Sequence, residues 1–239
     1  MKFLLQEIKG QVEDIEVFNA LNYIRYSPFK IDYKLIDIEE VKNTVEDLSD
    51  WIPIGRIPFI LEWLKKYWNV NKMNPIEVPK VLREFKYLGR EYKIVDKKDI
   101  MLEGNYFLKD IEHLKEFTYC GDLSRLKKED LTADRYVLSE IVDIVSEYRV
   151  FVSDLKIKAV QYYDGDCLIF PDSKIIQEMV LRYGFVKERP KSYTMDIAVL
   201  KNGKTVILEV HPVAAVGTYG YDAFELLYMY KEGIEFYKG

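Results

Sequence analysis

Hydrophobic and polar residues follow a strand–helix–strand order at the beginning of the chain. Residues 2–8 form a short apolar run, residues 12–26 carry apolar side chains at helical spacing, and residues 33–38 form a second strand-type run. Parallel strands need a crossover connection of about a dozen residues or more, and a helix usually supplies it. This order therefore predicts a small α/β unit with parallel strand pairing.

The next segment predicts a turn, a helix and a connector. Residues 52–55, Ile-Pro-Ile-Gly, have turn composition, and residues 57–68 have the apolar stripe of an amphipathic helix. Residues 69–79 are rich in Pro and Asn and predict a connector.

From about Tyr87 onward, short runs with strand character dominate. Two helical patterns interrupt them, a short one after Ile111 and a longer one at residues 173–183. This change predicts an N-terminal α/β domain at residues 1–90 and a second domain at residues 91–239. The predicted strands of the second domain are residues 92–95, 106–109, 136–140, 148–152, 156–163, 194–200 and 205–210.

Composition narrows the class of protein. Hydrophobic residues make up 49% of the chain and charged residues 31%, which is typical of a globular protein. The net charge of −5 argues against nucleic acid as a partner, since phosphate binding needs clustered Lys and Arg. No run approaches the ~18 apolar residues of a membrane span. The first seven residues are charged too early for an export signal, and Cys120 and Cys167 are isolated, so we expect a cytoplasmic protein.

A predicted hairpin brings two acidic residues together. Asn202-Gly203 between two apolar, β-branched runs indicates a two-residue type I′ turn, because both residues accept the positive φ that this turn requires. That register places Asp196 opposite Glu209 and Thr194 opposite His211. The other face of the hairpin is uniformly apolar.

Like charges at facing positions destabilise a sheet, and a divalent cation between the two carboxylates would reverse that effect. The alternatives are two solvated acids, or an acid paired with a lysine. The flanking residues Ala198 and Ile207 are apolar, so this face is not simply solvent, which favours a metal site.

The residues of this hairpin resemble those of the ATP-grasp superfamily. Residues 194–200 and 208–212 look like its C-terminal metal-binding strands. The match is greater with a compact phage and bacterial branch named for two arginines and a lysine, and most of residues 50–222 take part. The residues that resemble the motifs of this branch are Leu88-Gly89-Arg90, Lys109 with Lys115 to Thr118, Ser146 to Val152, and Gly217 to Gly220. The resemblance implies an ATP-grasp fold, in which antiparallel sheets and packed helices sandwich the nucleotide, preceded by a small α/β domain.

The resemblance also implies roles for individual residues. Lys109 would contact the α- and β-phosphates, Arg149 would face the transferred phosphate, and the strand containing Ser139, Glu140 and Ile141 would hold adenine. Asp196 and Glu209 would bind Mg²⁺. One departure stands out: the last metal ligand of the family is usually Asn, and this chain has His211. His211 would then bind a softer ion such as Mn²⁺, lie outside the metal's coordination sphere, or mark reduced activity.

Several of these side chains have a competing structural interpretation. Lys109 and Lys115 are either phosphate ligands or solvated lysines, and Arg90 is either a nucleotide contact or a surface arginine. Arg149 lies among apolar neighbours and needs a partner, for which we expect Glu147, two residues away on the same strand face. Glu147 is also a candidate nucleotide contact. Lys109 and Arg149 would stabilise the transferred charge as catalytic residues.

These features predict an ATP- and Mg²⁺-dependent ligase. It would activate a small-molecule or peptide carboxylate as an acylphosphate, which an amine co-substrate then attacks. Two alternatives stay open: a nucleotide-binding regulatory module without turnover, and ATP-dependent transfer to a hydroxyl or nucleic-acid acceptor.

Overall fold

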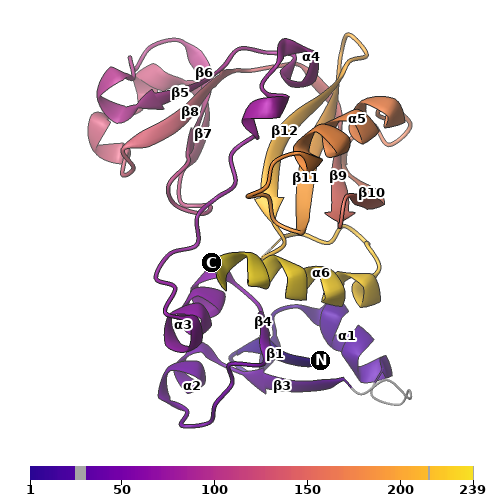
Figure 1. Cartoon of the computed structure of the whole chain (residues 1–239). Coiled ribbons are helices and arrows are strands. Elements are labelled where there is room, and N and C mark those ends of the chain that lie inside the picture. The colour runs from indigo at the N-terminus through magenta and orange to yellow at the C-terminus, as the bar shows by residue number, and fades with distance from the viewer. Residues whose placement is uncertain (25–30, 215, 239) are drawn as a thin grey trace. The chain divides into compact units, whose positions relative to one another are not determined.

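Helices and mainly antiparallel sheets build the protein in two compact units (Figure 1). The structure, a computed structural model, describes residues 1–24, 31–214 and 216–238. Unit 1 consists of residues 1–73, 190–193 and 212–239, and unit 2 of residues 74–189 and 194–211. The domain boundary expected after residue 90 stays a prediction; the spatial grouping assigns residues 74–90 to unit 2 and the C-terminal segment to unit 1.

The sheet of unit 1 is built around one central strand. β1 (Lys2–Ile8) pairs in parallel with both β3 (Asp32–Ile36) and β4 (Ile52–Ile54), and antiparallel with the short β2 (Gln11–Val12). The predicted parallel α/β unit is therefore confirmed. The predicted turn at residues 52–55 is wrong, because Ile52–Ile54 pairs with the fully buried residues of β1 instead.

The helices of unit 1 are α1 (Ile15–Ile24), α2 (Ile38–Asn43), α3 (Ile57–Trp68) and α6 (Ala223–Glu235), followed by a 3₁₀ turn at Phe236–Lys238. α3 and α6 contact β4, and α2 packs against α3. The bounds of α3 match the prediction. The last two residues of the first predicted helix, Arg25 and Tyr26, lie outside the described residues. α6 was not predicted; it packs against α1 and β4, and Asp222 caps its first turn.

The first sheet of unit 2 has the order β5-β8-β6-β7, with antiparallel pairing throughout. Its strands are β5 (Tyr92–Asp96), β6 (Asn105–Asp110), β7 (Thr118–Asp122) and β8 (Arg135–Glu140). β7 was not predicted. The short helix expected after Ile111 is wrong, because residues 111–116 form turns in which Lys115 adopts a positive φ of 60°.

The second sheet of unit 2 has the order β10-β9-β11-β12. Its strands are β9 (Ile144–Ser153), β10 (Lys156–Gly165), β11 (Ser192–Leu200) and β12 (Thr205–Pro212). α5 (Ser173–Gly184) lies against this sheet (Figure 1). The short helices of unit 2 are α4 (Phe85–Leu88) and 3₁₀ turns at Lys80–Leu82, Lys97–Asp99, Leu123–Arg125 and Lys128–Asp130. Among the described residues, no helix is long and apolar enough to cross a membrane.

The hairpin between β11 and β12 turns through three residues rather than two. The Leu200 N–H donates to the Lys204 carbonyl (2.8 Å), and the Gly203 N–H donates to the Leu200 carbonyl (2.8 Å). Of the loop residues, Gly203 alone has a positive φ, and the Asn202 side chain accepts from the Lys204 N–H instead (3.1 Å). Three-residue loops with a left-handed residue at the last position are the next most common hairpin connection after two-residue turns. The predicted two-residue turn, and the pairing derived from it at the loop, are wrong.

Candidate nucleotide and metal site

Three side chains of β11 and β12 converge despite the different turn. The carboxylate oxygens of Asp196 and Glu209 and a ring nitrogen of His211 all lie within 4.8 Å of one another. His211 Nε2 lies 3.1 Å from Asp196 Oδ2 and 3.1 Å from Glu209 Oε2. Glu209 and His211 are two residues apart on β12, and strand alternation places them on one face. The structure thus brings together all three predicted metal ligands.

Cationic side chains from neighbouring strands compensate the two acids. Arg149 of β9 forms a bidentate pair with Asp196, Nε to Oδ1 and Nη2 to Oδ2, both at 2.8 Å. Lys109 of β6 lies with Nζ 2.7 Å from Glu209 Oε2. Glu147 was the expected partner of Arg149, and Asp196 takes this place. The alternative of an acid paired with a lysine is what Lys109 and Glu209 form. The pair between Arg149 and Asp196 was not predicted.

The charges of this cluster shift its proton equilibria. Burial alone would raise the pKa of Glu209, but the His211 hydrogen bond and the Lys109 charge outweigh it and lower the pKa to about 2. Burial likewise opposes ionisation of Asp196, yet the hydrogen bonds from Arg149 and His211 leave its pKa below the ordinary value. Burial would lower the pKa of His211, and its two carboxylate partners raise it instead. Both carboxylates are therefore ionised at neutral pH.

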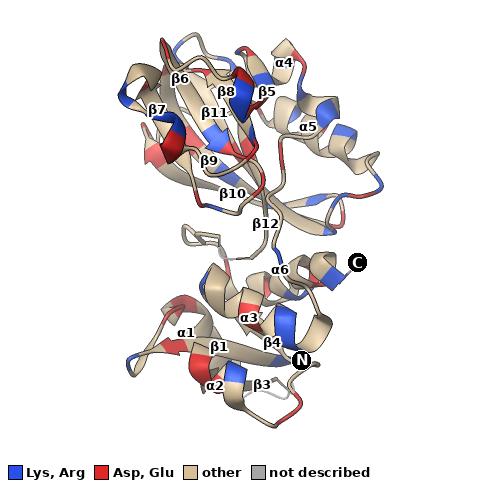
Figure 2. Ribbon diagram, turned by 90° about the vertical axis from the view of Figure 1, so that its left-hand side faces the viewer, with Lys and Arg blue, Asp and Glu red and all other residues tan. Residues whose placement is uncertain are grey.

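The charged residues of the site come from several strands. Figure 2 shows Lys and Arg interspersed with Asp and Glu on the ribbons of both units. The cations of the cluster come from separate elements, Lys109 from β6 and Arg149 from β9. The cluster is therefore a product of sheet topology rather than of a single charged segment.

Arg90 and Lys115 occupy different surroundings near this cluster. The Arg90 guanidinium is 7% exposed, and its hydrogen-bond acceptors among the described residues are neutral oxygens: Ser139 Oγ (2.9 Å) and the carbonyls of Leu88, Ile207 and Leu208 (2.8–3.2 Å). Burial lowers the pKa of Arg90. The Lys115 side chain is exposed overall, but loss of water around it and the nearby positive charge of Arg149 lower its pKa. Arg90 is thus not the solvated surface arginine that the sequence left open.

A cavity of about 400 Å³ opens between the two sheets of unit 2, next to the cluster. Glu140, Ile141 and Glu147 line it, as predicted for nucleotide contacts, whereas Ser139 is buried and accepts from Arg90. Apolar side chains from both sheets form much of its wall, which suits a planar ring. The full lining is Arg90, Phe107, Cys120, Glu140, Ile141, Val142, Ile144, Glu147, Tyr163, Asp196, Leu208 and Glu209.

Tyr163 belongs to the site, although the sequence did not single it out. It is the extra residue of a β-bulge, because Tyr162 pairs with Tyr148 and Asp164 pairs with Glu147. Its hydroxyl donates to Glu147 Oε2 (2.5 Å), and its ring centre lies 5.9 Å from the Arg149 guanidinium carbon. Bulges often re-aim a side chain next to an active site. With 19 tyrosines in the chain, no sequence signal marked this one.

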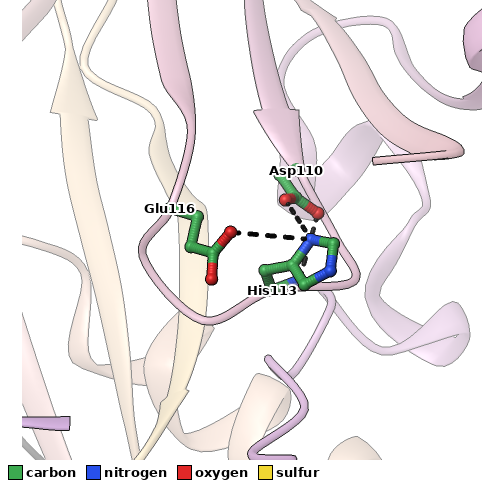
Figure 3. A group of neighbouring side chains, drawn as sticks. All are labelled: Asp110, His113 and Glu116. Atoms are coloured by element: carbon green, nitrogen blue, oxygen red, sulfur yellow. Dashed lines mark hydrogen bonds and ion pairs between the residues drawn. The ribbon is translucent and has the colours of Figure 1, made fainter. Parts of the chain in front are cut away.

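A second cluster of the same residue types lies at the end of β6 (Figure 3). His113 Nδ1 lies 2.8 Å from Asp110 Oδ2 and 4.0 Å from Glu116 Oε2. Asp110 Oδ1 also accepts from the backbone N–H groups of Glu112 (2.6 Å) and His113 (3.1 Å). These bonds are those of a side chain capping a turn. The geometry explains Asp110 without a ligand.

Several solved structures share this fold. The *Bacillus anthracis* D-alanine–D-alanine ligase complexed with ATP aligns with a TM-score of 0.58 at 13% identity, over 98% of this chain and 96% of that one. D-cycloserine synthetase DcsG aligns with a TM-score of 0.55 at 10% identity, over 98% and 99%. The *Chryseobacterium gregarium* RiPP-associated ATP-grasp ligase, in complex with ADP and a leader and core peptide, aligns with a TM-score of 0.53 at 12% identity, over 98% and 95%.

These likenesses confirm the predicted ATP-grasp fold, with helices and antiparallel sheets in an α+β arrangement. Among curated proteins, none matches the chain by sequence. The family model described as ATP-grasp domain, R2K clade family 2, matches residues 87–229, which is more than half of the chain. On this match, the chain belongs to the R2K clade of the ATP-grasp family.

Proposed function

We propose that this protein is an ATP-dependent ligase that joins a carboxylate to an amine. The observation that carries the proposal is the cavity between the sheets of unit 2, with the Asp196–Glu209–His211 cluster and its cations at one end. An apolar wall suits a base, and a cluster of exchangeable ionic partners suits a polyphosphate and its metal. The similar solved structures include ligases, and this supports the same class of reaction here.

ATP would lie with its adenine against the backbone of Glu140 and Ile141 and the apolar wall. Glu147, oriented by the Tyr163 hydroxyl, faces the same cavity and can accept a hydrogen bond from a ribose hydroxyl. Arg90 would face the phosphates, because its charge is buried among neutral oxygens and an anion would compensate it. Lys109 and Lys115 would add charge from β6 and the turn after it.

The residues present fit a divalent cation. Two carboxylates and one imidazole present donor atoms within 4.8 Å of one another beside the cavity, and these are common metal ligands. Asp196, Glu209 and His211 would hold the ion, which would neutralise phosphate oxygens when bound. Lys109 and Arg149 pair with the same carboxylates and can turn their charge toward a phosphoryl group placed there.

The chemistry needs no covalent enzyme nucleophile. A substrate carboxylate oxygen would attack the γ-phosphorus and release ADP, forming an acylphosphate. The amine nitrogen would then attack the acyl carbon, releasing phosphate and losing one proton to solvent or a nearby base. Arg149 and Lys109 would stabilise the charge on the transferred phosphoryl group. The carboxylate would belong to a small molecule or peptide.

One observation favours a second candidate. His211 stands where the family usually has Asn, and its ring already bridges Asp196 and Glu209. This supports a nucleotide-binding regulatory module without turnover. ADP release in the presence of carboxylate and amine pools separates the two functions.

Thermal unfolding with ATP, ADP or GTP, each with Mg²⁺ or Mn²⁺, tests nucleotide binding directly. A nucleotide at a hundredfold excess over its Kd should stabilise the protein by about 2.7 kcal/mol. Mass spectrometry of products from carboxylate and amine pools then tests the ligase reaction. Absence of stabilisation by any nucleotide would overturn both candidates, and stabilisation without ADP release or product would leave the regulatory module.

A further inference from the structure

The imidazole of His211 is directed between the carboxylates of Asp196 and Glu209. Its Nε2 is equidistant from Asp196 Oδ2 and Glu209 Oε2, at 3.1 Å from each. In this arrangement the Nε2–H group donates to both carboxylates. When an ion displaces that proton, the nitrogen lone pair and the carboxylate oxygens are directed to one place. A metal ion bound there would meet two oxygen donors and one nitrogen donor from the protein.

The ring is buried, which limits where it can go. His211 is 8% exposed and lies on a strand whose neighbouring residues Val210 and Pro212 are also buried. A ring packed in this way has little room to turn out to solvent when an ion arrives. Of the three roles considered for His211, a position outside the metal's coordination sphere therefore fits its location least.

The identity of the donor atoms selects among ions. Mg²⁺ is small, requires near-ideal octahedral geometry and takes oxygen ligands almost exclusively. Divalent transition metals accept imidazole readily, and Mn²⁺ among them also suits carboxylate and phosphate oxygens. A site with two carboxylates, one imidazole and phosphate oxygens nearby matches Mn²⁺ better than Mg²⁺.

We propose that His211 makes the metal site of this protein selective for Mn²⁺ over Mg²⁺. The inference rests on the proposed function for the role of the metal, and on the geometry of His211 for its identity. It chooses one of the three roles that the sequence left open for this histidine.

The second cluster supplies a matched control. His113 also lies beside an aspartate and a glutamate, but Asp110 already accepts from two backbone N–H groups, and Glu116 is exposed and 4.0 Å away. The same substitution of histidine by asparagine can therefore be made at both clusters.

The experiment measures Mn²⁺ binding to the full chain from the electron paramagnetic resonance signal of free Mn²⁺. Titrations are done with the metal alone and with a non-hydrolysable ATP analogue, and Mg²⁺ is added as competitor. We expect the wild type to bind Mn²⁺ at least tenfold more tightly than Mg²⁺. His211→Asn and His211→Asp should each lower this preference by about tenfold, since each replaces nitrogen by oxygen. His113→Asn should not change it.

Folding is checked for each variant by its unfolding transition, and the use of two His211 substitutions guards against one that fails to fold. An unchanged Mn²⁺-to-Mg²⁺ ratio in folded His211 variants overturns the inference. So does an equal effect of His113→Asn. If the metal alone binds with the expected selectivity but the ATP analogue does not bind, the inference stands and the proposed function fails. If the analogue binds with either metal equally well, the proposed function stands and the inference fails.

Discussion

The two histidine–carboxylate clusters of unit 2 contain the same residue types but differ in their surroundings. Asp196, Glu209 and His211 lie beside a cavity, and Arg149 and Lys109 compensate their charge. Asp110, His113 and Glu116 lie at a turn, where backbone N–H groups occupy the aspartate and the glutamate is exposed (Figure 3). The first cluster contains ion pairs beside a cavity. The second contains hydrogen bonds that stabilise the backbone turn after β6.

This difference shows that two clusters of the same residue types can have different surroundings. What distinguishes the first cluster is access from a cavity and cations from other strands, both of which depend on how the sheets are assembled. Four measurements test this difference between the two clusters.

The largest effect should come from breaking the buried ion pair of the first cluster. Arg149→Met leaves Asp196 buried without its bidentate partner, and such a loss costs about 3–5 kcal/mol of unfolding free energy. Urea denaturation measures it. Arg135→Met is the control near the second cluster: Arg135 and Glu112 lie 3.5 Å apart with Arg135 half exposed, so the loss should stay below about 1 kcal/mol. Equal losses at the two positions would contradict the contrast.

The next effect concerns ligand binding. In Glu209→Gln the metal-dependent part of the ATP stabilisation should disappear, because the amide lacks the charge that holds a cation. At a hundredfold excess of nucleotide over its Kd, the wild-type stabilisation is about 2.7 kcal/mol. Thermal unfolding with ATP and Mn²⁺ measures both. Glu116→Gln in the second cluster should keep the full stabilisation, and a loss there would show that the two clusters were assigned the wrong way round.

A smaller effect is expected from the second cluster itself. Asp110→Ala removes the acceptor for two backbone N–H groups and for His113, at a cost of about 1–2 kcal/mol. The loss should be the same with and without Mn²⁺ in urea denaturation. Asp110→Asn should cost less, since its amide oxygen can still accept. Stabilisation of the wild type by metal that Asp110→Ala abolishes would make this cluster a metal site.

The smallest effect is a pH dependence beside the first cluster. Burial raises the pKa of Glu147 above its ordinary value of 4.5, although the Tyr163 hydrogen bond acts in the opposite direction. The neutral acid is therefore favoured in the folded state. Its contribution to stability is present below about pH 4.5 and is lost as pH rises through the folded-state pKa.

Wild type should lose unfolding free energy relative to Glu147→Gln across that window, as measured by urea denaturation from pH 4 to pH 7. The exposed Glu116→Gln provides the control, with an expected difference from wild type within about 0.5 kcal/mol. A gain of wild type over Glu147→Gln as pH rises would contradict the stated cause.

Much of the secondary structure could be predicted because periodicity is local. α3 was predicted to the residue, and the predicted strands of unit 2 are all present, although their ends differ by a few residues. β4 was missed because three residues with two isoleucines and a proline resemble a turn, and only pairing with β1 makes them a strand. α6, which packs on α1 and β4, was missed.

The site shows the same division between local and distant information. Asp196 and Glu209 were predicted from strand alternation and a hairpin, even though the turn has three residues instead of two, and His211 was implied by the family resemblance. The partner of Arg149 was wrong, because the nearest acid along the strand is not the nearest in space. Tyr163 was missed because a bulge, which is a property of strand pairing, directs it to Glu147.

Local patterns were therefore enough to predict most of the elements in their order, the residue types available for chemistry and the hairpin on which the acids lie. The tertiary structure alone decided which cations compensate them, how Arg90 is buried, and that one histidine cluster lies at a cavity while the other caps a turn. The physical reason is that hydrophobic period and turn chemistry act over a few residues, whereas charge compensation and burial depend on strands that meet only in the folded sheet.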